Sequence, residues 1–262
     1  MSGPGSLGVA EILRRIRQTY VGEQKKDLVV VRLLYRPLSF FLSVPPLLLG
    51  LGPNQVTFLN FLLVVAACAL FAVGVPAATA AGAALFLAIF VMDCVDGDLA
   101  RYLNQRRYFG KLIDGLVDVL VYLIYIAVAV GNVRQGRSAL GETADLLAGA
   151  AIALAMTFTS YFRMRLAQLL GEVRRDVPGS GNGRQGHTSL VRRMILALRA
   201  TYENLGPLGP ILLVAALLAG QVTAFLLAYA AGYILFAAAE VGYGLWHYRH
   251  LLNVPRPSKK AA

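Results

Sequence analysis

The sequence predicts an all-α integral membrane protein with six transmembrane helices, an N-terminal interfacial amphipathic helix and both termini in the cytoplasm. The chain has 262 residues, of which 57% are hydrophobic, whereas soluble domains contain about 45–50% apolar residues. These residues are gathered into segments long enough to cross a bilayer. All but two of the 25 Lys and Arg residues, Arg134 and Arg137, fall on one side of the predicted spans. Cytoplasmic loops carry an excess of Lys and Arg, so this side is predicted to be cytoplasmic. Because both termini fall on the same side, an even number of spans is expected.

The net charge of +11 does not by itself indicate a protein that binds nucleic acid. The basic residues cluster at the ends of the apolar segments, where they suit the surface of a membrane. We therefore expect the lipid bilayer as a partner, in a cytoplasmic or inner membrane, and no nucleic acid.

Residues 1–52 are predicted to form an amphipathic and juxtamembrane segment. Residues 8–20 have the pattern of a short basic helix that lies on an anionic membrane surface. Its apolar face would consist of Ile12, Ile16 and Tyr20, with Arg14, Arg15 and Arg17 largely off that face. Residues 29–51 are apolar but interrupted by prolines, so we expect them to lie along the interface rather than to cross it.

Residues 53–250 are predicted to form the membrane domain, and residues 251–262 a basic, disordered tail. The six predicted spans cover residues 55–74, 77–102, 109–131, 143–170, 204–219 and 222–246. Pro53 stands where a helix commonly begins, just ahead of the first span.

Acidic residues are concentrated where the second span ends and the third begins. At roughly 100° per residue, Asp93, Asp96, Gly97 and Ala100 share one helical face, and Asp98 points about 140° away. Asp114 and Asp118 lie one turn apart on the following helix, with Gly110 one turn earlier. The polar residues 102–107 between the two helices suit a short turn. The helices would then run antiparallel and bring the four carboxylates of Asp93, Asp96, Asp114 and Asp118 together.

Four carboxylates in one pocket repel one another, and their burial near a membrane core is costly. Divalent cations relieve both costs, and the all-oxygen set of ligands favours Mg²⁺ or Mn²⁺. Gly97 and Gly110 would let a ligand approach the backbone, and Arg101 could neutralise a phosphate oxygen. The alternative is that these aspartates cap helices or pair with nearby arginines.

The motif resembles the signature of the CDP-alcohol phosphotransferase family, D-x-x-D-G-x-x-A-R, eight residues, then G-x-x-x-D-x-x-x-D. Members of this family move a phosphoalcohol unit from a CDP-linked donor onto a hydroxyl group and release CMP. The resemblance implies two divalent cations at the four aspartates, with Asp118 as general base. It also implies that the CDP donor contacts Gly97, Ala100, Arg101 and Gly110, and that the protein is a homodimer.

Family members often begin the first span with a P-N-x-x-T stretch that helps to wall the nucleotide site. Pro53, Asn54 and Thr57 match this stretch. The resemblance therefore adds Asn54 and Thr57 to the residues that bind the donor. Ordinary helix starts have the same composition, so that reading stays open.

A second resemblance indicates which residues bind the acceptor. Residues 160–165 are similar to an S-Y-x-R-x-R run in family members that use phosphorylated acceptors, such as inositol phosphate or glycerol 3-phosphate. Arginine binds phosphate bidentately, so Arg163 and Arg165, joined by Arg192 and Arg193, are predicted to bind an acceptor phosphate. The alternative is that these arginines are the flanking charges of cytoplasmic loops.

The favoured hypothesis is transfer of phosphatidyl from CDP-diacylglycerol to a phosphorylated alcohol, in phospholipid biosynthesis. The same chemistry with serine or inositol as acceptor, or with a CDP-choline or CDP-ethanolamine type of donor, stays open. Prenyl transfer is a rival, because membrane prenyltransferases also pair aspartate motifs around Mg²⁺. A transporter of divalent cations is an alternative from another class.

Overall fold

The computed structural model describes residues 8–21, 28–105, 108–176 and 205–253, and this part of the chain is helical throughout, with no strand. The N-terminal helices are α1 (Val9–Val21), η2 (Val31–Tyr35), α2 (Arg36–Leu42) and α3 (Val44–Leu48). The long helices are α4 (Pro53–Val73), α5 (Pro76–Tyr102), α6 (Tyr108–Val121), α7 (Leu123–Arg134), α8 (Glu142–Asp176) and α10 (Val222–Leu252). A shorter apolar helix, Leu205–Leu218, precedes α10.

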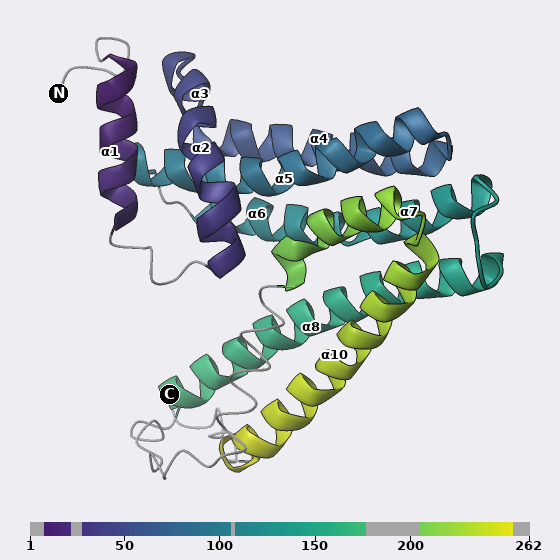
Figure 1. Ribbon diagram of the computed structural model, residues 1–262. Coiled ribbons are helices and arrows are strands. Elements are labelled where there is room, and N and C mark those ends of the chain that lie inside the picture. The colour runs from purple at the N-terminus through teal and green to yellow at the C-terminus, as the bar shows by residue number, and fades with distance from the viewer. Residues whose placement is uncertain (1–7, 22–27, 106–107, 177–204, 254–262) are drawn as a thin grey trace.

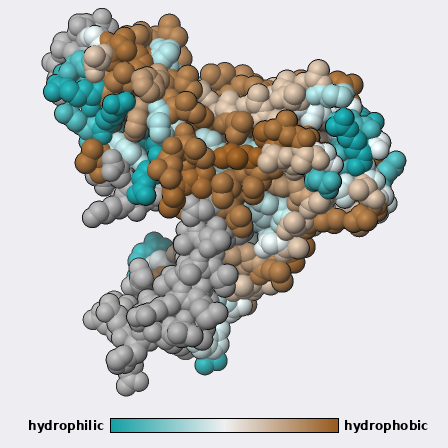
Figure 2. Space-filling model, in the orientation of Figure 1, coloured by the Kyte–Doolittle hydropathy of each residue, from teal (hydrophilic) through white to brown (hydrophobic). Residues whose placement is uncertain are grey.

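Five helices within the described residues are long and apolar enough to cross a membrane. They are Pro53–Val73, Pro76–Tyr102, Leu112–Arg134, Glu142–Val173 and Val222–Arg249. Each corresponds to a predicted span, and the predicted fifth span corresponds to the shorter helix Leu205–Leu218. The all-helical membrane fold is confirmed with five spans, whereas six spans and the orientation of the termini stay predictions. Figure 2 shows hydrophobic surface along the middle of the helices and hydrophilic surface towards both ends.

The predicted third span is interrupted at Tyr122, which separates α6 from α7. The Tyr122 N–H donates to the Val119 carbonyl three residues earlier, and Tyr125 bonds back to Tyr122 in the same way. This tighter spacing marks a local 3₁₀-type turn inside the span. The turn lies one turn beyond Asp118, at the wall of the cavity described below.

The ends of α4 and α5 follow from their local sequence. The Gly52 N–H donates to Gln55 Oε1 at 2.8 Å, and Pro53 occupies the first turn of α4. Gly74 ends α4 with a φ of +75°, which glycine adopts without strain. After α5, Asn104 takes a φ of +53°, a conformation that asparagine tolerates better than most residues. The Gln105 N–H then donates back to the Ala100 carbonyl, so the chain turns away directly after the motif of α5.

The core lies where α4, α5, α7, α8 and α10 pack together (Figure 1). Its largest buried side chains include Phe71, Phe86, Tyr125 and Tyr233. At the end of the bundle remote from the motif, buried Asp145 accepts hydrogen bonds from Asn132 at 2.6 Å and from Ser138 at 2.8 Å. This carboxylate therefore has a structural role, joining α7 to α8.

Gly131 of α7 lies against the backbone of α4 at Phe71. A Cβ at this position would overlap the Phe71 carbonyl oxygen, which belongs to rigid backbone. We expect Gly131→Ala to lower the midpoint of thermal unfolding in detergent, because overpacking typically costs about 1–3 kcal/mol. Gly232→Ala is the matched control, since a Cβ there meets nothing within 4 Å. Equal midpoints for the two variants would contradict this account of the contact.

The N-terminal segment crosses the ends of α4 and α5 (Figure 1). Ile12, Ile16 and Tyr20 are buried, as the amphipathic pattern predicts. The three arginines of α1 are exposed, and hydrogen bonds from Arg14 and Arg15 lower the pKa of Glu11 to about 2. The apolar face of α1 packs on Val95 and Leu99 of α5, so it covers protein as well as presenting a basic face outward.

Candidate active site

The two aspartates of α5 that the motif assigns to the site lie in different surroundings. Asp96 is buried, and the Thr57 hydroxyl of α4 donates to its Oδ2 at 2.9 Å. Asp93, one turn earlier, is exposed and lines a cavity. Thr57 therefore holds the orientation of the Asp96 carboxylate, while Asp93 remains accessible to a ligand.

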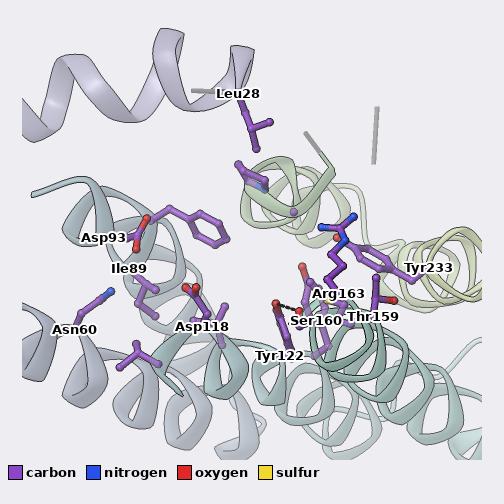
Figure 3. A pocket seen from close by; sticks show the side chains of 17 residues that line it. Leu28, Asn60, Ile89, Asp93, Asp118, Tyr122, Thr159, Ser160, Arg163 and Tyr233 are labelled. Carbon is purple, nitrogen blue, oxygen red and sulfur yellow. Dashed lines mark hydrogen bonds between the residues drawn. The ribbon is translucent and has the colours of Figure 1, made fainter. Parts of the chain in front are cut away.

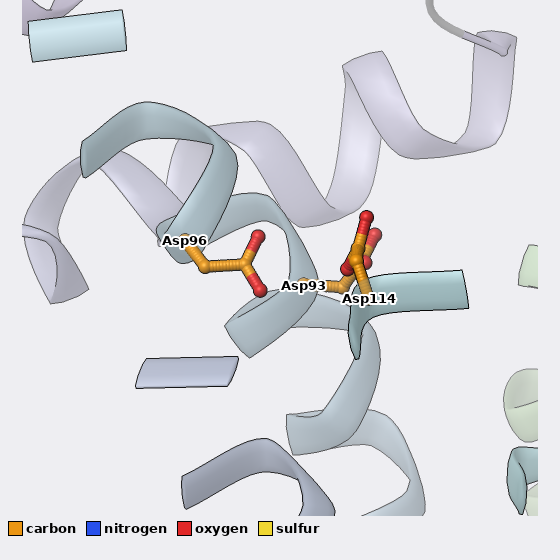
Figure 4. Close-up of side chains that lie close together, drawn as sticks. All are labelled: Asp93, Asp96 and Asp114. Carbon is orange, nitrogen blue, oxygen red and sulfur yellow. The ribbon is translucent and has the colours of Figure 1, made fainter. Parts of the chain in front are cut away.

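Helix α6 brings the second pair of aspartates to the same place. Asp93, Asp96 and Asp114 each offer a carboxylate oxygen, and these three oxygens lie within 4.8 Å of one another. Figure 4 shows the three side chains converging from the two helices. The predicted antiparallel arrangement thus does bring acids of both helices together. Asp118 is outside this group of three and is exposed to the cavity that Asp93 also lines.

A cavity of about 370 Å³ extends from the aspartates towards α8 and α10, which is the size of a site for a small molecule. In Figure 3, Asp93 and Asp118 lie on one side of it, and Arg163 and Tyr233 on the other. Between them the Tyr122 hydroxyl lies 3.0 Å from Ser160 Oγ. The site therefore has an acidic half on α5 and α6 and a polar half on α7, α8 and α10.

Asp98 takes no part in the carboxylate group, in agreement with its predicted position on another face. Its side chain is fully buried and forms ion pairs with Arg36 at 3.0 Å and with Arg101 at 2.7 Å. Arg101, which the sequence suggested for a phosphate oxygen, is therefore bound to a carboxylate of its own helix. The Arg101 guanidinium also lies beside Gly97, where an added Cβ would be 3.4 Å from one of its nitrogens.

The other residues predicted to bind the donor are spread around the acidic half. Thr57 contacts Asp96 directly, whereas Asn54 is exposed one turn earlier on α4. Ala100 is half-buried on the last turns of α5. Gly110 lies on the backbone of α6, in the turn before Asp114.

The predicted acceptor arginines do not form one group in the described residues. Arg163 lines the cavity, and its Nε donates to Glu240 Oε1 of α10 at 2.6 Å. Arg165 is exposed and hydrogen-bonds Gln168 on its own helix. Residues two apart on a helix point in different directions, which explains the separation. Arg192 and Arg193 lie outside the described residues.

Sequence reasoning did not identify several residues of the site. Asn60 lines the cavity on α4 and follows Thr57 by three residues, a helical spacing that could have indicated it. Glu240 is an acid within an apolar span, which is itself a signal of function or pairing. Tyr122 and Tyr233 line the cavity too, but nothing in the sequence distinguishes them from core tyrosines.

Membrane-spanning helices that bring three carboxylates together beside a cavity define a membrane protein with a candidate site for divalent cations. The family profile described as CDP-alcohol phosphatidyltransferase matches residues 51–241, and the chain belongs to this family. Its members are transferases of substituted phosphate groups that generally use divalent cations. The chain is accordingly an integral membrane transferase. Membership of this family decides against prenyl transfer and cation transport, because its members transfer substituted phosphate groups. None of the curated proteins matches the chain.

Proposed function

We propose that this protein transfers the phosphatidyl group of CDP-diacylglycerol to the hydroxyl group of a small alcohol, releasing CMP, in phospholipid biosynthesis. The observation that carries the proposal is the convergence of three carboxylates from α5 and α6 beside a cavity with a polar far wall. A lipid donor can keep its acyl chains in the bilayer while its head group enters at the ends of these helices.

The carboxylate group fits divalent cations. Three oxygens within 4.8 Å of one another, all from hard carboxylate ligands, suit Mg²⁺ or Mn²⁺. Asp93, Asp96 and Asp114, with Asp118 beside them, would hold two ions. Bound there, the ions would supply positive charge to the donor's pyrophosphate and to the departing CMP.

Asp118 is the proposed general base. The acceptor hydroxyl oxygen forms a bond to the phosphorus that carries the diacylglycerol, and the bond from that phosphorus to the CMP oxygen breaks. The acceptor's proton passes to the Asp118 carboxylate. Exposure of Asp118 to the cavity supports this role, because an acceptor bound there would reach it.

The donor's nucleotide is proposed to occupy the acidic half of the site. Thr57 fixes Asp96, and Gly97 and Gly110 carry no side chain that would block the approach of a ligand to the helices. Asn54, at the start of α4, and Ala100, near the end of α5, complete the set of residues proposed to contact the donor. Arg101, held by Asp98, adds positive charge beside Gly97.

The acceptor is proposed to occupy the polar half of the cavity. Arg163, Ser160 and Tyr122 line it, and a guanidinium there favours a phosphorylated acceptor such as glycerol 3-phosphate or inositol phosphate. The second candidate is a non-phosphorylated acceptor, serine or inositol. One observation favours it, since Glu240 already offsets part of the Arg163 charge at 2.6 Å.

Two arginine variants separate these acceptors. If Arg163 binds an acceptor phosphate, Arg163→Gln should raise the KM for that acceptor about 10- to 100-fold, the usual effect of losing a charged hydrogen bond. Arg165→Gln is the matched control, because Arg165 is exposed and bonded to Gln168. Steady-state kinetics at saturating donor measures both. Equal KM values for the two variants would show that Arg163 does not bind the acceptor and is instead a basic residue that flanks the membrane span.

The proposed function is tested by measuring CMP release from purified protein in detergent or vesicles with CDP-diacylglycerol. The acceptors to compare are glycerol 3-phosphate, inositol phosphate, serine and inositol, each with CDP-choline as the alternative donor. CMP release that depends on one acceptor and yields the corresponding phospholipid supports the proposal. No release of CMP from any CDP-linked donor would overturn it.

Topology and assembly complete the proposal. The excess of basic residues on one side supports a cytoplasmic location for the active-site end of α5, six spans and both termini inside. A homodimer is proposed because members of the family are commonly homodimers.

A further inference from the structure

Asp98 belongs to no site assigned so far, although it stands inside the motif of α5. Its carboxylate is inaccessible to solvent and accepts hydrogen bonds from three close donors, with a fourth polar group beside them. Oδ1 accepts from Arg36 at 3.0 Å and from Arg101 at 2.7 Å. Oδ2 accepts from Ser39 at 2.7 Å and lies 3.5 Å from Ser43 Oγ. Arg36, Ser39 and Ser43 belong to the N-terminal segment, and Arg101 is the arginine of the motif.

Helix α1 covers the two arginines that pair with Asp98. The Tyr20 ring lies 4.8 Å from the Arg36 guanidinium and 5.9 Å from that of Arg101, within the range of cation–π attraction. Ile12 and Ile16 of α1 pack with Val95 and Leu99, the residues of α5 that flank Asp96 and Asp98. The N-terminal segment is thus fastened to the last turns of α5, from which the motif projects.

Arg36 also contacts the backbone of the motif. One of its guanidinium nitrogens donates to the Cys94 carbonyl at 3.2 Å, between Asp93 and Asp96 in the sequence. Buried ionic groups with several hydrogen bonds fix the geometry of the groups they join. The pairing with Asp98 therefore leaves the Arg101 side chain, 14% exposed, with a defined position before any substrate arrives.

We propose that Asp98, Arg36 and Tyr20 are positioning residues, which hold the Arg101 guanidinium for the phosphates of the CDP donor. The N-terminal helices α1 and α2, which lie outside the family match to residues 51–241, thereby complete the donor site. This inference rests on the proposed function, because it needs a CDP donor beside Arg101. It assigns to the N-terminal segment a part in donor binding as well as in membrane attachment.

The test compares Asp98→Asn and Arg36→Gln with Arg14→Gln, a control on the exposed face of α1. We expect both site variants to raise the donor KM about tenfold or more, because a small displacement of a positioned group has effects of that size. The kcat at saturating donor and the acceptor KM should stay within about twofold of the wild type, as removal of uniform binding predicts. Arg14→Gln should leave all three constants unchanged.

Donor KM does not depend on the fraction of folded enzyme, so it separates positioning from simple stabilisation. Variants with less active protein but a wild-type donor KM would show a structural anchor only and overturn the inference. If Asp98→Asn and Arg36→Gln do not fold, Tyr20→Leu decides, with Tyr20→Phe as its ring-preserving control. A donor KM that is raised for Tyr20→Leu but not for Tyr20→Phe supports the inference. Equal donor KM values for these two variants overturn it. Wild-type protein that releases no CMP would instead refute the proposed function.

Discussion

Asp118→Asn is expected to lower kcat by about 10²- to 10⁴-fold, the contribution that a general base makes to catalysis. The amide keeps the size of the side chain but cannot accept the acceptor's proton. Asp118 stands outside the group of three converging carboxylates, so binding of the CDP donor should be largely retained. Release of CMP at saturating substrates measures kcat, and equilibrium binding of a labelled CDP donor measures the second property.

Glu142→Gln is the control for this substitution, because Glu142 is an exposed acid at the start of α8, away from the cavity. It should turn over like the wild type. A rate near wild type for Asp118→Asn would remove the assignment of the base. Loss of donor binding together with turnover would instead make Asp118 chiefly a ligand of the cations.

Removal of divalent cations is expected to abolish CMP release, and Mg²⁺ or Mn²⁺ should restore it. The physical reason is the mutual repulsion of carboxylates whose oxygens lie within 4.8 Å of one another, in a site that must also accept a pyrophosphate. The measurement is CMP release after treatment with a chelator, followed by titration of each cation.

Asp96→Asn tests the same point at one residue. It should shift the cation titration to higher concentration, since Asp96 is the buried member of the group and is oriented by Thr57. Thr57→Val, which removes only the orienting hydroxyl, should shift it in the same direction by less. Turnover that persists without any divalent cation would contradict the whole account of the carboxylate group.

The geometry of the acidic half could be predicted because it depends on local rules. A rotation of roughly 100° per residue separates Asp98 from Asp93 and Asp96, and the structure puts Asp98 in contact with Arg36 instead of the other acids. The polar turn after α5 likewise predicted that α6 would bring Asp114 back to Asp93. Both inferences needed only spacing along one or two adjacent helices.

The polar half could not be predicted in the same way, because its contacts join residues far apart in the sequence. Arg163 meets Glu240 across 77 positions, and no local pattern specifies which acid an arginine will reach. The two arginines at 163 and 165 looked equivalent as a motif but face different ways on α8. The last two, Arg192 and Arg193, lie outside the described residues.

The shared carboxylate of Asp98 has a practical consequence for anyone who shortens or transplants this chain. A protein expressed from residue 51, the first position of the family match, would lack Arg36, Ser39 and Ser43. Of the three close donors to the buried Asp98 carboxylate it would keep only Arg101. Val95 and Leu99 would also lose the cover of α1. Useful expression clones, chimeras and N-terminal fusions should therefore start ahead of Val9.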